Sequence, residues 1–141
     1  MTRLVIDASI AIKWVVQEPG TDQALALRRH QLLAPDLLVA ECANILWKKK
    51  TRGELTPDEA AAAASLLERA DIDLAPMRPL LHAATRLAIS LDHPAYDCVY
   101  LALAQANGIA FATADVGFFN KVRQTPAAAA IVTLAQAAAL N

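Results

Sequence analysis

The short apolar stretch Leu4-Val5-Ile6, which ends at Asp7, constrains the fold of this chain more than any other feature. It is too short for a helix, so it predicts a buried central strand that ends in a carboxylate. In open α/β sheets, ligands and catalytic groups collect just outside the carboxyl ends of the strands. Asp7 is therefore placed for chemistry, with the alternative that Asp7 or Ser9 only caps the helix that follows.

The same arrangement of a strand followed by an acid recurs near the other end of the chain. Residues 109–112 form an apolar run that continues into Thr113-Ala114-Asp115. Between the two acids, hydrophobic periodicity and helix-breaking residues predict short strands that alternate with helices. We expect strands at 32–34, 72–75 and 131–133, and helices at 8–16, 21–31, 37–52, 57–70, 79–91, 95–107 and 116–123. This alternation predicts an α/β fold with a doubly wound sheet, and 141 residues fit one domain, 1–141, with a single core.

The charge balance argues against a protein that coats nucleic acid, because 13 basic residues stand against 14 acidic ones. Any contact with nucleic acid must then use local patches of positive charge. The candidates are Lys13 and a basic run at the end of a predicted helix, made of Lys48, Lys49, Lys50 and Arg52. The alternative for each of them is a solvated helix face.

The cysteines and the hydropathy predict a reducing, aqueous environment. Cys42 and Cys98 lie far apart and form no Cys-x-x-Cys pair, which is typical of small buried hydrophobic residues. No apolar run approaches the roughly 18 residues of a membrane span, so we expect a soluble cytoplasmic protein with no targeting segment and no membrane contact. Because 56% of the residues are hydrophobic, apolar surface should remain for a partner or a second copy, and we expect a homo-oligomer.

Two further acids lie on predicted helices. Glu41 shares the apolar face of helix 37–52, where a lone carboxylate is unfavourable unless it is paired or bound to a metal. Asn44, one turn later, either lines the same site or is an ordinary polar helix residue. Asp97 lies in the first turn of helix 95–107 on the side of its apolar residues, although the helix dipole alone would also favour an acid there.

A doubly wound sheet can bring Asp7, Glu41, Asp97 and Asp115 to one edge. Four clustered carboxylates repel one another, and no Lys or Arg lies beside them in sequence, so a divalent cation is the expected counter-charge. Ligands that are all oxygen select Mg²⁺, with Mn²⁺ as a substitute, over zinc. One or two such ions can hold a phosphate and activate a water. The expected reaction is therefore hydrolysis of a phosphodiester bond.

At these residues the sequence resembles the PIN-domain nucleases, and among them the VapC-type toxins of toxin-antitoxin pairs. The order and spacing agree over nearly the whole chain for four segments: Val5-Ile6-Asp7-Ala8-Ser9, Glu41-Cys42-Ala43-Asn44, Tyr96-Asp97-Cys98-Val99-Tyr100-Leu101-Ala102-Leu103-Ala104 and Thr113-Ala114-Asp115. The resemblance implies a three-layer α/β/α sandwich with a central parallel sheet of about five strands. It also implies a Mg²⁺-dependent endoribonuclease site made of Asp7, Glu41, Asp97 and Asp115, which Thr113 supports by hydrogen bonding. The implied partners are RNA, a second copy in a homodimer, and a VapB-like antitoxin whose tail enters the acidic groove.

Two other functions remain open. A receiver-like module that senses phosphate or metal without catalysis would need a phosphoacceptor Asp at the end of a middle strand, whereas the strand from Ile72 ends in Ala75-Pro76. A DNA-directed flap nuclease or exonuclease of related fold would ordinarily need more acids and a longer chain. The leading prediction is an endoribonuclease toxin.

Overall fold

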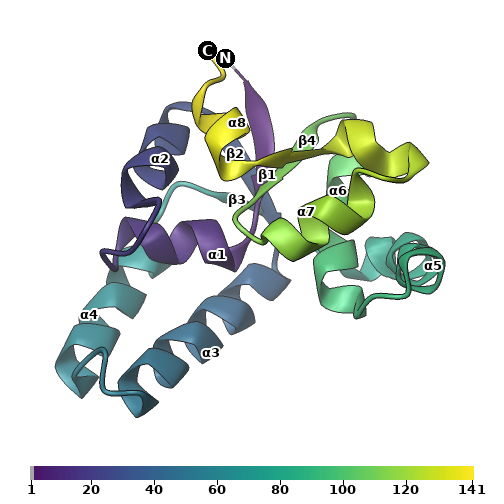
Figure 1. Ribbon diagram of the computed structural model, residues 1–141. Coiled ribbons are helices and arrows are strands. Elements are labelled where there is room, and N and C mark those ends of the chain that lie inside the picture. Colours follow the sequence, from purple (N-terminus) through teal and green to yellow (C-terminus); the bar gives the residue numbers. More distant parts are fainter. Residues whose placement is uncertain (1) are drawn as a thin grey trace.

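A computed structural model describes residues 2–141, and its centre is a sheet of five parallel strands in the order β3-β2-β1-β4-β5 (Figure 1). The strands are β1 (Arg3–Ile6), β2 (Gln31–Pro35), β3 (Asp73–Ala75), β4 (Ala110–Thr113) and β5 (Ile131–Thr133). All five lie where the sequence predicts a strand, to within a residue or two at each end. The predicted α/β fold with a parallel sheet of about five strands is therefore confirmed.

Helices cover both faces of this sheet. The α-helices are α1 (Ala8–Ala11), α2 (Thr21–Ala26), α3 (Leu37–Thr51), α4 (Pro57–Glu68), α5 (Leu81–Leu91), α6 (Ala95–Asn107), α7 (Val116–Val122) and α8 (Leu134–Ala138). The 3₁₀ turns are η1 (Ile12–Trp14), η2 (Leu27–Arg29), η3 (Arg78–Leu80) and η4 (Pro126–Ala130). None of the helices within residues 2–141 is long and apolar enough to cross a membrane.

The strand order explains how the helices divide between the two faces. The chain moves outward from β1 to β2 and β3, and then returns across the sheet to β4 and β5. Right-handed crossovers in opposite directions put their helices on opposite faces. In agreement, α5, α6 and α7 lie together on one side, away from α1 to α4 (Figure 1), which makes the three-layer α/β/α sandwich.

Local sequence explains where several elements begin and end. Thr56 and Glu59 form a reciprocal capping box at the start of α4. The predicted helix 8–16 tightens into a 3₁₀ turn after Ala11, and the predicted helix 21–31 ends early because β2 begins at Gln31. The alanine-rich tail, whose low complexity is uninformative about secondary structure, forms α8, and Thr133 and Gln136 make a second capping box at its start.

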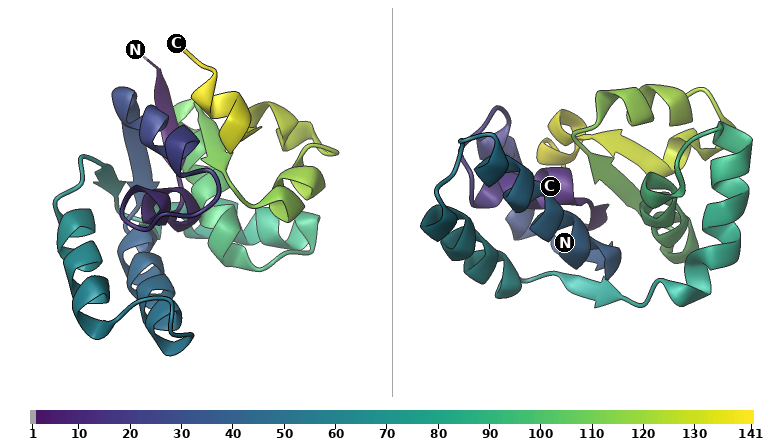
Figure 2. Two further views of the ribbon diagram at one scale, coloured as in Figure 1. Left: turned by 60° about the vertical axis from the view of Figure 1, so that its left-hand side comes forward. Right: turned by 90° about the horizontal axis from the view of Figure 1, so that it is seen from below.

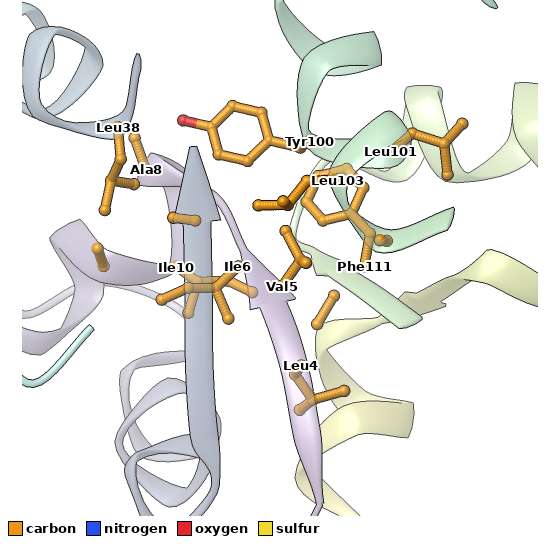
Figure 3. Packing of buried hydrophobic residues seen from close by; sticks show 14 of the residues in the cluster. Leu4, Val5, Ile6, Ala8, Ile10, Leu38, Tyr100, Leu101, Leu103 and Phe111 are labelled. Carbon is orange, nitrogen blue, oxygen red and sulfur yellow. The ribbon is translucent and has the colours of Figure 1, made fainter. Parts of the chain in front are cut away.

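The buried core is built around β1. Its apolar residues belong to one buried cluster with side chains of α1, α3, α6 and β4, several of which are drawn in Figure 3. Tyr100, Leu101 and Phe111 are fully buried there, and the rings of Tyr100 and Phe111 stack with centroids 5.5 Å apart. The two ends of the chain lie side by side (Figures 1 and 2), where Thr2 Oγ1 donates to the carbonyl of Asn141 at 2.9 Å. The strands β1 and β4 therefore carry their last residues to the opposite edge of the molecule.

Candidate active site

The pairing of β1 with β4 places the first acid of the site. Ile6 is aligned with Ala112, so Asp7 follows β1 beside Thr113, the last residue of β4. Thr113 Oγ1 donates to Asp7 Oδ2 at 2.7 Å. Asp7 Oδ1 accepts from the Ser9 hydroxyl and, at 3.3 Å, from the Ile10 N–H. Asp7 therefore caps α1 and also belongs to a polar network that connects it to the end of β4.

Burial makes the charge of Asp7 unfavourable. Only 6% of the residue is exposed, and this burial raises the pKa of Asp7 from 3.8 to about 6. The hydrogen bonds from Ser9 and Thr113 act in the opposite direction, while the charge of Asp97 raises the pKa further. At neutral pH this side chain is an anion in a place that gains from a positive counter-charge.

Glu41 reaches the same region from α3. The carboxylate is half-buried, and the hydroxyl of Tyr100, a buried residue of α6, donates to Glu41 Oε1. Figure 3 shows the Tyr100 hydroxyl pointing toward Leu38 on α3. Burial is the main cause that raises the pKa of Glu41, the bond from Tyr100 lowers it, and the charge of Asp97 raises it. Burial and Glu41 also raise the pKa of Tyr100, so the tyrosine keeps the proton that it donates.

Asp97 and Asp115 complete the set of acids from two other helices. Asp97, in the first turn of α6, acts electrostatically on both Asp7 and Glu41 and accepts from His93 Nε2 at 2.7 Å. Asp115 is exposed, and its Oδ1 caps α7 by accepting from the Phe118 N–H at 3.0 Å. The backbone N–H of Asp115 donates to Thr113 Oγ1 at 3.0 Å, so Thr113 connects this acid to Asp7.

The chemistry of these side chains fits a hard divalent cation, because every candidate ligand atom is a carboxylate oxygen. Within residues 2–141, however, no three His, Cys, Asp or Glu side chains are grouped closely enough to hold a metal ion. The carboxylates are instead hydrogen-bonded to donors of the protein. The structure thus shows acids that are coupled through their charges and through Thr113.

The other predicted site residues differ in their surroundings. Ser9 contacts Asp7, and its hydroxyl also accepts from the Ala114 N–H at 3.4 Å. Asn44 is exposed and makes no side-chain hydrogen bond with another residue of the described chain. It therefore stays a prediction without a contact that supports it.

The predicted cations separate into two groups. Lys13 and Lys49 both pair with Glu18, at 2.9 and 3.0 Å, and Lys49 also lies 3.5 Å from Glu54. These ion pairs reduce the charge that the two lysines offer to a phosphate. Lys48, Lys50 and Arg52 are exposed at the end of α3, and we call these three residues the basic tip. The basic tip begins about two helical turns beyond Glu41 and ends about three turns beyond it, or roughly 10 to 16 Å along the helix axis.

Sequence reasoning missed three polar residues that contact the acids or their neighbours. Tyr100 lies one turn after Asp97 on α6, a spacing that puts both on one helix face. His93 lies four residues before Asp97, the spacing of one helical turn. This spacing was not recognised, because His93 lies in the helix-breaking segment Asp92-His93-Pro94, before the start of α6. Lys121 comes from α7 and has no local signal, because only the packing of α7 brings it to His93.

Comparison with known proteins gives one family and several structural neighbours, among them the following two. The sequence model of the PIN domain family matches residues 4–124, whereas no curated protein sequence matches the chain. The crystal structure of PAE2754 from Pyrobaculum aerophilum superposes with a TM-score of 0.72 at 20% identity, covering 99% of this chain and 97% of that one. VapC20 of Mycobacterium tuberculosis, described as a sarcin-ricin loop cleaving toxin, superposes with a TM-score of 0.60 at 14% identity, covering 79% of this chain and 87% of that one.

Proposed function

We propose, because this chain belongs to the PIN domain family of nucleases, that it is an endoribonuclease that hydrolyses phosphodiester bonds of RNA. Nucleases of this family generally depend on a divalent metal, and here we propose Mg²⁺, with Mn²⁺ as a substitute. The whole chain, 1–141, would act as a single nuclease domain. Asp7, Glu41, Asp97 and Asp115 are the proposed catalytic and metal-binding residues.

The observation that carries this proposal is the environment of Asp7. Its carboxylate is buried at the carboxyl edge of the sheet, is aligned by Thr113 and Ser9, and lies in the field of Asp97. A merely structural cap would gain nothing from a second acid that raises its pKa. A site that takes up a cation gains from both charges, because each carboxylate then stabilises the same bound ion.

The residues around the acids have separable roles in the proposed mechanism. Thr113 and Ser9 hold the carboxylate of Asp7 in one orientation, and Tyr100 holds one oxygen of Glu41. Asp7, Glu41, Asp97 and Asp115 would hold a Mg²⁺ ion, which would neutralise charge at the phosphate and lower the pKa of an attacking water. Glu41, whose carboxylate is half-buried, would act as the acceptor of a proton in the reaction.

We also propose that the chain acts as the toxin of a toxin-antitoxin pair in the cytoplasm, as a homodimer inhibited by a VapB-like antitoxin. The description of VapC20 as a toxin that cleaves the sarcin-ricin loop supports an RNA substrate for a chain of this fold. Exposed apolar side chains, among them Trp47 at 61% and Leu81 at 69%, support a protein partner or a second copy. Receiver-like sensing and DNA cleavage have no observation here that favours them.

A cleavage assay tests the proposed function. Purified protein should cut single-stranded RNA with Mg²⁺ or Mn²⁺, leave DNA of the same sequence intact, and stop in EDTA. Asp7→Asn and Asp115→Asn should each lower the rate strongly, whereas Asp71→Asn, a matched change in an exposed loop, should leave it unchanged. Cleavage that continues undiminished in excess EDTA would refute the metal-centred mechanism. Equal cleavage of DNA would refute the RNA assignment, and a lack of any cleavage would favour a sensing module.

A further inference from the structure

His93 lies between one of the proposed catalytic acids and a lysine from another helix. His93 Nε2 is 2.7 Å from Asp97 Oδ2, and His93 Nδ1 is 3.4 Å from Lys121 Nζ. Lys121 Nζ also donates to the carbonyl of Asp92 at 3.2 Å, which anchors the ammonium beside the ring. The side chains of His93 and Asp97 are 18% and 30% exposed, so the contact between them is partly shielded from water.

The chemistry of these neighbours assigns the proton on the imidazole. A lysine ammonium donates hydrogen bonds and accepts none, so His93 Nδ1 must be the acceptor in its contact with Lys121. The proton of the neutral ring then resides on Nε2, which donates to Asp97 Oδ2. Asp97 Oδ2 is thus held by one directed hydrogen bond, while Oδ1 makes no side-chain hydrogen bond with another described residue.

The same short helix that carries Lys121 also holds the ring in place by packing. Phe118 of α7 packs against the imidazole of His93 with ring centroids 4.7 Å apart and an angle of 42° between the planes. The N–H of Phe118 is bonded to Asp115 Oδ1 at 3.0 Å. One helix therefore contacts Asp115 at its start and fixes the imidazole that bonds to Asp97.

We infer that His93 is a positioning residue for Asp97. Its Nε2–H, set by Lys121 and supported by Phe118, fixes Asp97 Oδ2 and leaves Oδ1 available to a divalent cation. Partners of this kind orient a carboxylate ligand through its second oxygen. Their removal typically lowers metal affinity or activity by about 10- to 100-fold. This inference rests on the proposed function, because it assumes that Asp97 binds the metal.

Two substitutions that differ by one methylene separate positioning from simple packing. The amide nitrogen of a glutamine can reach the place of the imidazole Nε2, whereas that of an asparagine reaches only the place of Nδ1. His93→Gln therefore keeps the donor to Asp97, and His93→Asn loses it. His82→Asn changes an exposed histidine of α5 in the same way and serves as the matched control.

The inference is tested by direct binding of Mn²⁺ in the absence of RNA. The electron paramagnetic resonance signal of the free ion measures how much Mn²⁺ is bound. His93→Asn should bind Mn²⁺ about tenfold more weakly than wild type, His93→Gln within about threefold of wild type, and His82→Asn equally well. If His93→Asn does not melt like a folded protein, His93→Leu takes its place, because it keeps an apolar side chain against Phe118 and has no donor, and it should bind as weakly.

The possible results separate this inference from the proposed function. Wild-type affinity in His93→Asn, or equal losses in His93→Asn and His93→Gln, would overturn the positioning role while the metal site stands. Asp97→Asn is the reference for the site itself and should abolish the tight binding. If wild type binds no Mn²⁺, or if Asp97→Asn binds as wild type does, the proposed metal site fails and this inference fails with it.

Discussion

Replacement of Asp7 by asparagine should stabilise the protein in the absence of metal, because it removes a buried negative charge. In the folded chain the pKa of Asp7 is about 6, against 3.8 ordinarily, mainly because the group is buried. At about 1.36 kcal/mol for each pKa unit, the buried charge destabilises the folded state by about 3 kcal/mol at neutral pH. Asp7→Asn should recover most of this and raise the melting temperature on the order of 10 °C.

The sign of the pH dependence distinguishes this effect from a general change in packing. The folded pKa is raised, so between about pH 3.8 and 6 the folded state binds more protons than the unfolded state. Stability contributed by Asp7 therefore falls as pH rises through this window, and the full penalty is present above about pH 6. In the variant this titration is absent. The advantage of Asp7→Asn over wild type should thus shrink by about 2 kcal/mol between pH 7.5 and pH 4.

The measurement is urea unfolding of both chains in EDTA at several pH values, followed by tryptophan fluorescence. The asparagine amide makes different hydrogen bonds with the hydroxyl groups of Ser9 and Thr113, which can donate or accept. This difference adds a constant to the free energy of unfolding, because neither the amide nor the hydroxyl groups titrate between pH 4 and pH 7.5. Asp71→Asn, on an exposed loop, should show no such dependence on pH. A stability difference between Asp7→Asn and wild type that stays constant from pH 4 to pH 7.5 would refute the reasoning.

Other perturbations test other parts of the structure. Asp97→Asn should raise stability in EDTA, since it relieves repulsion with the neighbouring acids. Wild type should gain roughly 2.7 kcal/mol from Mg²⁺ at one hundred times the dissociation constant, and Asp97→Asn should gain less. Lower stability of this variant in EDTA, with a response to Mg²⁺ equal to that of wild type, would contradict the role of Asp97. Gly20→Ala should destabilise the chain by about 1 to 2 kcal/mol in thermal melts, because Gly20 has a φ of 89° and a Cβ would lie 3.1 Å from Leu134 Cδ2. Alanine at all three positions of the basic tip should weaken RNA binding and flatten its salt dependence, and an unchanged slope would leave the basic tip as a solvated surface.

The prediction of the fold from sequence succeeded because its signals are local. An apolar run that stops at an acid predicts β1 and β4 without reference to the rest of the chain. In the same way, a proline after a capping threonine predicts the start of α4. The parallel arrangement follows from the alternation of strands and helices. The signal failed in the alanine-rich tail, where uniform composition gives no periodicity, and a capping box alone marks α8.

Candidate acids could be selected from sequence, but most of the donors around them could not; Thr113 is the exception, because the family resemblance implies its hydrogen bond. A strand that ends in a carboxylate, as at Asp7, already indicates the edge of the sheet at which that residue lies. The donors that orient the acids come from distant parts of the chain: Thr113 is 106 residues from Asp7, and Tyr100 is 59 residues from Glu41. No local pattern encodes such a pair, because the first exists only when β4 pairs with β1 and the second only when α3 and α6 come together.

The sequence by itself thus determined most of the elements and their alternation, and it selected the four acids as candidates, since each of these signals lies in neighbouring residues. Only the tertiary structure decided which partners those side chains meet. It pairs Lys13 and Lys49 with Glu18, and it sets His93 between Asp97 and Lys121. Hydrogen bonds and ion pairs act over about 3 to 4 Å, so their partners are known only when packing has brought separate segments within that distance.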